Sequence, residues 1–376
     1  MEYMKKLSIV LGFRDRDIVR VKKCLDSLAA QTFTDFSVVF VDYGSLPETA
    51  RLAEETVATY PFAKYVYSHT RGMVWNRSRA LNTGLHFTDA PYILFGDIDL
   101  IYSANFLQSA MAYAAPERLV CAPMHFLSKK MSVLTKTQIS THKLPISHAP
   151  IGAILLLSRQ AIETLNGFDE YYCFWGIEDR DLIARLHLIG IDICVMDAYE
   201  APVLHQWHPI VSNQKKNFFP DRWWDTMNIY YQSNIRNFRR NPREMGKIYT
   251  ENDRRTLSSL IVPFSFPPTG DTYTRAKIIC SLVEAVGNLA TCEALKLELQ
   301  FLSAKDLFLK KVQEIYALFC NKPAPGFSPQ EDIFYTVWQL IQNGDVSDYF
   351  FNYTRDKLIC TLAGRLPLSG HTCQRQ

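Results

Sequence analysis

The chain has 376 residues, which is enough for one large domain and a smaller one. Apolar residues make up 48% of it and aromatic residues 13%, and this composition supports a sizeable core and excludes a disordered protein. A net charge of +3 gives no general attraction to an acidic polymer, so we expect no nucleic-acid partner.

Short apolar runs alternate with amphipathic segments through roughly the first hundred residues. The predicted strands are 7–11, 36–41, 65–67 and 92–95, and the predicted helices are 18–28 (capped by Asp17), 47–58 and 77–86. A further strand is predicted at 151–157 and a short helix at 159–165. Alternation of this kind predicts an α/β fold in which helices cover both faces of a mostly parallel sheet.

The pattern changes near residue 245. Apolar residues recur at helical spacing through 274–320 and again through 331–363, on either side of a Pro/Gly-rich linker at 323–329. We therefore expect one domain at 1–245 and a C-terminal α-helical domain at 246–376. That second domain could be a packed helical unit, mediate dimerisation, bind a partner enzyme or rest on a membrane, and the oligomeric state stays open.

Three predicted strands end in polar residues, at Phe13–Arg16, Asp42 and Asp97–Asp99. Ligands of such sheets bind beyond the carboxyl ends of the strands, so we expect these ends to lie close together. Two carboxylates at i and i+2 can hold a divalent cation together with diphosphate oxygens, although the same triplet also occurs as a solvated strand end. His205 is a candidate to complete such a metal site.

The segment Trp175–Asp181 places four charged residues at the start of a predicted helix, one residue after a tryptophan and a glycine. Acidic residues in that position are favoured by the helix dipole, which is the simple capping interpretation. A carboxylate there can also act as a general base towards a bound hydroxyl, and a tryptophan face suits the C–H face of a sugar. The aromatic run at 218–224 is more typical of a core than of an acceptor site.

The amino-terminal residues are too charged, and the apolar run after them too short, for a signal peptide or a spanning helix. Nine scattered cysteines suggest a reducing compartment. We expect a cytoplasmic enzyme, with peripheral association at the inner face of a membrane left open, or a soluble part of a longer protein.

These segments follow one another in an order that resembles inverting glycosyltransferases of families 2 and 7, above all β-1,4-galactosyltransferases and the bacterial chondroitin-polymerase type domains. The resemblance covers about residues 5–240, and the matching stretches are Gly12–Arg16, Trp75–Gly84, Phe95–Ile101, Gly167–Asp169, Trp175–Asp181 and His205–Gln206. It implies a GT-A nucleotide-binding fold, a UDP-sugar donor, Mn²⁺ or Mg²⁺ as cofactor, and a glycan or glycolipid acceptor.

The resemblance also implies roles for individual residues. Those implied to bind the nucleotide sugar are Phe13, Arg14, Arg16, Asp42 (to uracil), Trp75, Asn76, Arg77, Asp97 and Ile98. Those implied at the acceptor end are Trp175, Gly176 and Arg180, with Asp179 as the base and Glu178 beside it. Asp99 and His205 are the implied metal ligands.

Two residues depart from the family pattern. Ile177 replaces the second of two glycines, and a β-branched side chain disfavours the left-handed backbone. Arg180 replaces the middle acid of a triplet, which favours an acidic acceptor such as a uronic acid.

The predicted function is transfer of a hexose or N-acetylhexosamine, with galactose or N-acetylgalactosamine expected, in surface polysaccharide synthesis. A retaining enzyme similar to the polypeptide N-acetylgalactosaminyltransferases and a non-catalytic sugar-binding module are the alternatives. A nucleotidyltransferase is disfavoured because Gly12-Phe13-Arg14 is not a glycine-rich phosphate loop.

Overall fold

The computed structural model describes residues 5–133, 141, 144–147, 152–174, 176–209, 223–241, 245–254, 256, 259–264, 272–290, 293–300, 329–353 and 357–364. The chain divides into two compact units. The first comprises residues 1–71, 75–213 and 224–248, and the second comprises residues 72–74, 214–223 and 249–376.

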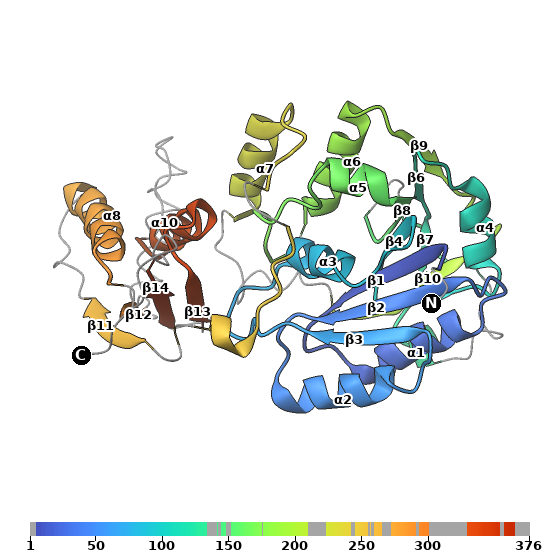
Figure 1. The fold of residues 1–376 in the computed structure, drawn as a ribbon, viewed down its shortest axis with the longest axis horizontal. Helices are drawn as coiled ribbons and strands as arrows, with labels where there is room; N and C mark the ends of the chain where they lie inside the picture. Colours follow the sequence, from blue (N-terminus) through green and yellow to red (C-terminus); the bar gives the residue numbers. More distant parts are fainter. Residues whose placement is uncertain are drawn as a thin grey trace, which may run out of the picture. The chain divides into compact units, whose positions relative to one another are not determined.

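A seven-stranded sheet with the order β3-β2-β1-β4-β8-β6-β9 forms the centre of the first unit (Figure 1). Its strands are β1 (Leu7–Phe13), β2 (Phe36–Asp42), β3 (Ala63–Tyr67), β4 (Tyr92–Asp97), β6 (Arg118–Cys121), β8 (Ile154–Ser158) and β9 (Asp192–Val195). β3, β2, β1 and β4 are parallel to one another, whereas β8 runs antiparallel to both β4 and β6. The mostly parallel sheet is therefore confirmed, and the ends of β1, β2 and β4 meet at one edge as expected.

Helices cover both faces of this sheet, as the alternation predicted. They are α1 (Ile18–Ala29), α2 (Pro47–Val57), α3 (Arg77–Leu85), α4 (Phe106–Tyr113), α5 (Arg159–Thr164) and α6 (Glu178–Leu188). Successive side chains of a strand point to opposite faces, so Ile9 and Leu11 of β1 join the apolar cluster beneath α1 and α2, while Val10 joins the cluster beneath α3. Asp17 caps α1 by accepting a hydrogen bond from the Val19 N–H, as expected.

A small three-stranded sheet, which the sequence did not predict, follows the end of β4. It has the order β5-β10-β7, with β5 (Leu100–Tyr102) antiparallel and β7 (Met124–Phe126) parallel to β10 (Val203–His205). The short 3-10 turn η1 (Met131–Val133) lies after β7. The first unit also contains most of α7 (Trp223–Asn234).

The second unit contains a four-stranded sheet, so the expectation of an all-helical C-terminal domain is wrong. The sheet has the order β11-β12-β14-β13, and its strands are β11 (Leu260–Phe264), β12 (Glu293–Gln300), β13 (Asp348–Tyr353) and β14 (Lys357–Ala363). The helices are α8 (Thr272–Gly287), α10 (Pro329–Asn343) and the 3-10 turn η5 (Glu251–Asp253). Residues 301–328, which include part of the predicted helices and the linker, lie outside the described residues.

The error over β12 has a simple physical cause. The apolar residues Leu295 and Leu299 have helical spacing, but Leu297 between them completes an alternation with polar residues. Leu295 and Leu297 are buried and the intervening Lys296 is exposed, which is the period of a strand.

The two tryptophans of the aromatic run at 218–224 have different environments. Trp223 is buried in the second unit and packs on Phe334 and Trp338, whereas Trp224 belongs to the first unit and is 48% exposed. The core interpretation therefore holds for Trp223 and is wrong for Trp224, and residues 218–220 lie outside the described residues.

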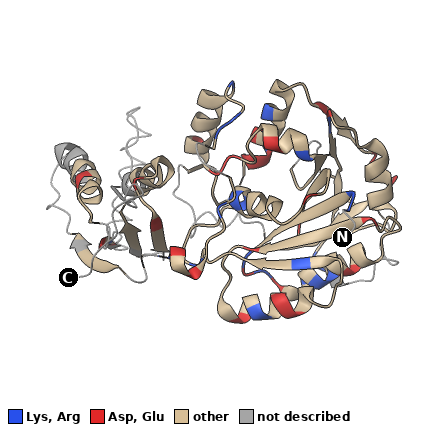
Figure 2. Cartoon of the chain, in the orientation of Figure 1, with Lys and Arg blue, Asp and Glu red and all other residues tan. Residues whose placement is uncertain are grey.

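Lysine, arginine and acidic residues are scattered over the elements of the first unit (Figure 2). Among the helices that the structure describes, none has the length and apolar character needed to cross a membrane.

Candidate active site

Strand pairing brings Asp99 and two histidines together. β5 begins directly after Asp99, and its antiparallel register with β10 sets His205 opposite Leu100. The Gln206 N–H then donates to the Asp99 carbonyl at 2.9 Å. Ligand atoms of Asp99, His205 and His208 all lie within 4.8 Å of one another, and we call these three residues the metal cluster.

The hydrogen bonds of the metal cluster fit a divalent cation. A carbonyl only accepts, so His208 Nδ1, 3.0 Å from the Pro209 oxygen, carries the proton that it donates. In the neutral ring the lone pair then lies on Nε2, 3.2 Å from Asp99 Oδ2. Asp99 Oδ1, 3.7 Å from His205 Nε2, is buried without a hydrogen-bond partner in the described part of the chain. A histidine lone pair that faces the Asp99 carboxylate in this way needs a proton or a metal ion between the two groups. A ligand set of nitrogen and oxygen atoms suits Mn²⁺.

Charge acts differently on the three groups of the metal cluster, because the hydrogen bond to Asp99 raises the pKa of His208 and so favours a proton on this ring when no cation is bound. Burial lowers the pKa of His205, which keeps its ring neutral. Burial opposes ionisation of Asp99, but the hydrogen bond that protonated His208 donates, together with the charge of that ring, lowers the pKa of Asp99 overall. The structure brings Asp99 and His205 together, and it adds His208, which the sequence reading did not assign, as a further candidate ligand.

The acidic pair, Glu178 and Asp179, lies at the start of α6. The Gly152 N–H donates to Asp179 Oδ2 at 2.9 Å, and the Arg180 N–H donates to Asp179 Oδ1 at 2.7 Å. A Cβ atom at Gly152 would stand 1.8 Å from the Asp179 Cβ, so only glycine permits this approach. Two backbone donors therefore fix the orientation of the Asp179 carboxylate.

Arg77 of α3 links the end of β4 to the acidic pair. Its Nε and Nη2 donate to Asp97 Oδ1 at 3.0 and 2.8 Å, and its Nη1 lies 3.9 Å from Glu178 Oε1. Burial raises the pKa of Glu178 to about 7, the charge of Asp179 adds to the effect, and Arg77 opposes it. Glu178 is thus partly protonated at neutral pH, beside a carboxylate that is held in place.

Ile177, directly before the acidic pair, has φ 76° and ψ −27°, which is the left-handed conformation. The expectation that its β-branched side chain avoids this conformation is wrong. Left-handed backbone costs roughly 1–2 kcal/mol for such a residue. The Ile177 side chain is only 3% exposed, and burial of an isoleucine offsets a cost of that size.

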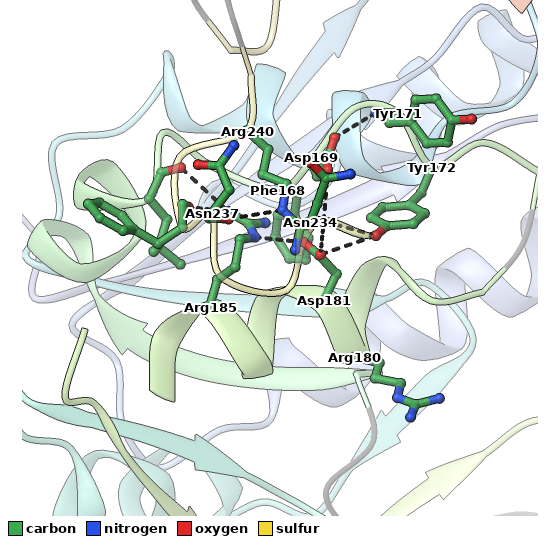
Figure 3. A network of polar contacts seen from close by, with 12 residues as sticks. Phe168, Asp169, Tyr171, Tyr172, Arg180, Asp181, Arg185, Asn234, Asn237 and Arg240 are labelled. Atoms are coloured by element: carbon green, nitrogen blue, oxygen red, sulfur yellow. Dashed lines mark hydrogen bonds and ion pairs between the residues drawn. The ribbon is translucent and has the colours of Figure 1, made fainter. Parts of the chain in front are cut away.

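A buried ion network lies beneath the start of α6 (Figure 3). Asp181 Oδ2 lies 2.6 Å from Arg185 Nε, and Asp181 Oδ1 lies 2.6 Å from Arg240 Nη1. Arg240 also pairs with Asp169 at 3.5 Å, and burial, with the charge of Asp181, raises the pKa of Asp169 to about 6. This network, which the sequence did not reveal, anchors the helix that carries the acidic pair.

Three residues implied to bind the nucleotide offer little side-chain surface. Phe13 is 1% exposed and packs on Phe40, and Ile98 is 5% exposed in the same core cluster. Asp42 is fully buried, and its oxygens accept hydrogen bonds from Ser45 N–H and Tyr65 O–H, so a hydrogen bond from Asp42 to uracil is not supported. Core packing therefore accounts for Phe13 and Ile98, and hydrogen bonding within the turn after β2 accounts for Asp42.

The remaining implied nucleotide residues lie near the same edge of the sheet. Arg14 is half-buried and Arg16 exposed directly after β1. Trp75 packs edge-on against Tyr43 at 5.8 Å. Asn76 is buried and caps α3 by accepting a hydrogen bond from the Arg79 N–H, so its position is structural.

At the implied acceptor end, Gly176 has φ 92° and Arg180 is exposed. Trp175 lies outside the described residues. Gly176 and Arg180 therefore lie next to the acidic pair, and the role of Trp175 in binding a sugar stays a prediction.

Comparison with known proteins finds galactosyltransferases among the similar sequences. The chain is 27% identical over 149 residues to β-1,4-galactosyltransferase 7 of Drosophila melanogaster, covering 39% of the chain and 40% of the relative. It is 29% identical over 133 residues to human β-1,4-galactosyltransferase 1, covering 34% of the chain and 29% of the relative. The matches thus span less than half the length of these relatives.

Among solved structures, a mannosyltransferase of Pyrobaculum calidifontis in complex with GDP-mannose and Mn²⁺ matches 91% of the chain and 88% of its own, with 12% identity and a TM-score of 0.43. The family model described as glycosyl transferase family 2 matches residues 8–182, which contain Asp99 and the acidic pair. Residues 8–182 therefore form a family 2 glycosyltransferase domain, an enzyme domain of the GT-A type.

Proposed function

We propose that the chain is an inverting, metal-dependent glycosyltransferase that moves a hexose or N-acetylhexosamine from a UDP-sugar to a hydroxyl of a glycan or glycolipid. The observation that carries this proposal is the metal cluster at the end of β4, connected through Asp97 and Arg77 to the acidic pair on α6. The likeness to β-1,4-galactosyltransferases supports galactose or N-acetylgalactosamine as the transferred sugar.

In this proposal Asp179 accepts the proton of the acceptor hydroxyl, because its carboxylate is held by the N–H groups of Gly152 and Arg180. The acceptor oxygen bonds to the anomeric carbon as the bond from that carbon to the diphosphate oxygen breaks, and a single displacement inverts the configuration. A divalent cation at the metal cluster would supply positive charge that stabilises the leaving diphosphate. Arg77 holds Asp97 in position between the two ends of the site.

The biological setting is part of the same proposal. We propose that the enzyme acts on the cytoplasmic side in the synthesis of a surface polysaccharide. The support for this setting is the cysteine content and the family resemblance of the sequence.

The proposal is tested by UDP release from a panel of UDP-sugars, with Mn²⁺ and with EDTA. We expect manganese-dependent release from one donor, lowered at least about 100-fold in Asp99→Asn because a metal ligand is lost. Asp192→Asn, at an exposed aspartate of β9, is the matched control and should leave release unchanged. No release from any donor, together with no metal-dependent UDP binding, would show a non-catalytic sugar-binding module instead.

A further inference from the structure

The exposed indole of Trp224 lies beside the acidic pair. A Cβ built on Gly176 would stand 2.6 Å from Trp224 Cζ3, so the ring lies against the backbone two residues before Glu178. Trp224 is nevertheless 48% exposed, which leaves much of its surface open to a ligand. The loop before α6 therefore has a large aromatic surface next to it, supplied by Trp224 of α7.

The same helix also contacts a cation that directly follows the acidic pair in the sequence. The Arg180 guanidinium carbon lies 5.1 Å from the centre of the Tyr231 ring. Tyr231 is seven residues after Trp224, and residues at that spacing share one face of a helix. Figure 3 shows Arg180 pointing away from the buried ion network that Asp181 and Arg185 enter. Arg180 is thus an exposed, oriented cation directly after Asp179.

An aromatic face that packs on the residue before Ile177 and a cation that follows Asp179 together define a class of ligand. A pyranose presents an apolar C–H face that packs on an indole, and its polar edge stays free for hydrogen bonds. A guanidinium pairs best with a carboxylate, to which it can donate two parallel hydrogen bonds. A sugar that satisfies both groups carries a carboxylate on its ring.

We propose that Trp224 and Arg180 form an acceptor subsite for a uronic acid, in which Trp224 stacks on the sugar ring and Arg180 pairs with its carboxylate. The proposal rests on the proposed function, because it assigns the acceptor of the same reaction. Trp224 acts there as a sugar-binding residue outside the family 2 match at 8–182, and Arg180 is the residue that distinguishes an acidic from a neutral acceptor.

The test uses methyl β-D-glucuronide and methyl β-D-glucoside as probes of the whole protein with UDP and Mn²⁺, read by saturation-transfer NMR. Wild type should bind the glucuronide more tightly than the glucoside. Trp224→Ala should weaken both about tenfold, and Trp224→Phe should restore binding because it keeps an aromatic face. Arg180→Ala should weaken the glucuronide about fivefold and leave the glucoside unchanged.

Ile229→Ala is the matched control, since Ile229 is 68% exposed on the same helix. It should bind both sugars as wild type does. Equal binding of both sugars by wild type, or wild-type binding by Trp224→Ala, overturns the subsite. Calorimetry of UDP with Mn²⁺ distinguishes failure of the subsite from failure of the proposed function. If UDP binds and the glucuronide does not, the subsite alone is refuted. If UDP does not bind, the proposed function is refuted.

Discussion

The variant Glu178→Gln is expected to be more stable than wild type at alkaline pH. Burial, together with the charge of Asp179, raises the pKa of Glu178 to about 7 from an ordinary value of 4.5. Below pH 4.5 the carboxyl is neutral in both the folded and the unfolded chain, so it imposes no penalty on folding. As pH rises through these two values, the unfolded chain ionises more readily, and wild type loses stability. A pKa difference of one unit between the folded and the unfolded chain corresponds to roughly 1.4 kcal/mol, so the raised pKa of Glu178 costs wild type about 3 kcal/mol of stability at alkaline pH.

The measurement is urea unfolding of both proteins in EDTA, followed by circular dichroism between about pH 4 and about pH 8.5. The stability difference should be close to zero at the acidic end and grow to about 3 kcal/mol in favour of the variant at the alkaline end. Glu163→Gln, at an exposed glutamate of α5, controls for loss of a surface carboxylate. If the difference in unfolding free energy stays constant with pH, or favours wild type at high pH, the raised pKa of Glu178 in the folded protein is refuted.

Three further changes test the geometry around the acidic pair. Gly152→Ala should lower the turnover of UDP-sugar about 100-fold, because a Cβ at that position displaces Asp179. An unchanged turnover in a steady-state assay of UDP release would contradict this prediction. Ile177→Gly should be about 1 kcal/mol more stable than Ile177→Ala, because the backbone there is left-handed; thermal unfolding of the two variants compares them at equal loss of the side chain. Arg240→Leu should cost about 3–5 kcal/mol in urea unfolding because it leaves Asp181 buried with one partner fewer, and a near-neutral effect would show that Arg185 suffices.

The parts of the structure that local patterns specify were predictable from the sequence. Each strand of the parallel half is a short apolar run, and α1 begins at its capping residue Asp17. Because parallel strands end at one edge, the meeting of Arg14, Asp42 and Asp97 followed from element order alone.

Features that depend on long-range pairing were missed. His208 became visible as a candidate ligand only through the register of β10 with β5, although its position three residues after His205 was a usable signal. The burial of Asp42 depends on Tyr65 of the neighbouring strand, which no local pattern reports. Trp224 differs from Trp223 in its surroundings rather than in its local sequence.

Arg77 makes the two ends of the site thermodynamically linked. Its guanidinium binds Asp97 while it lowers the proton affinity of Glu178, and its Nη1 has no hydrogen bond to the described residues. Any ligand that draws Arg77 towards the end of β4 therefore makes Glu178 easier to protonate. Linkage is reciprocal, so a proton on Glu178 must change the affinity for that ligand by the same factor. Since the pKa of Glu178 is about 7, we expect the binding of a nucleotide sugar to exchange protons with the buffer at neutral pH.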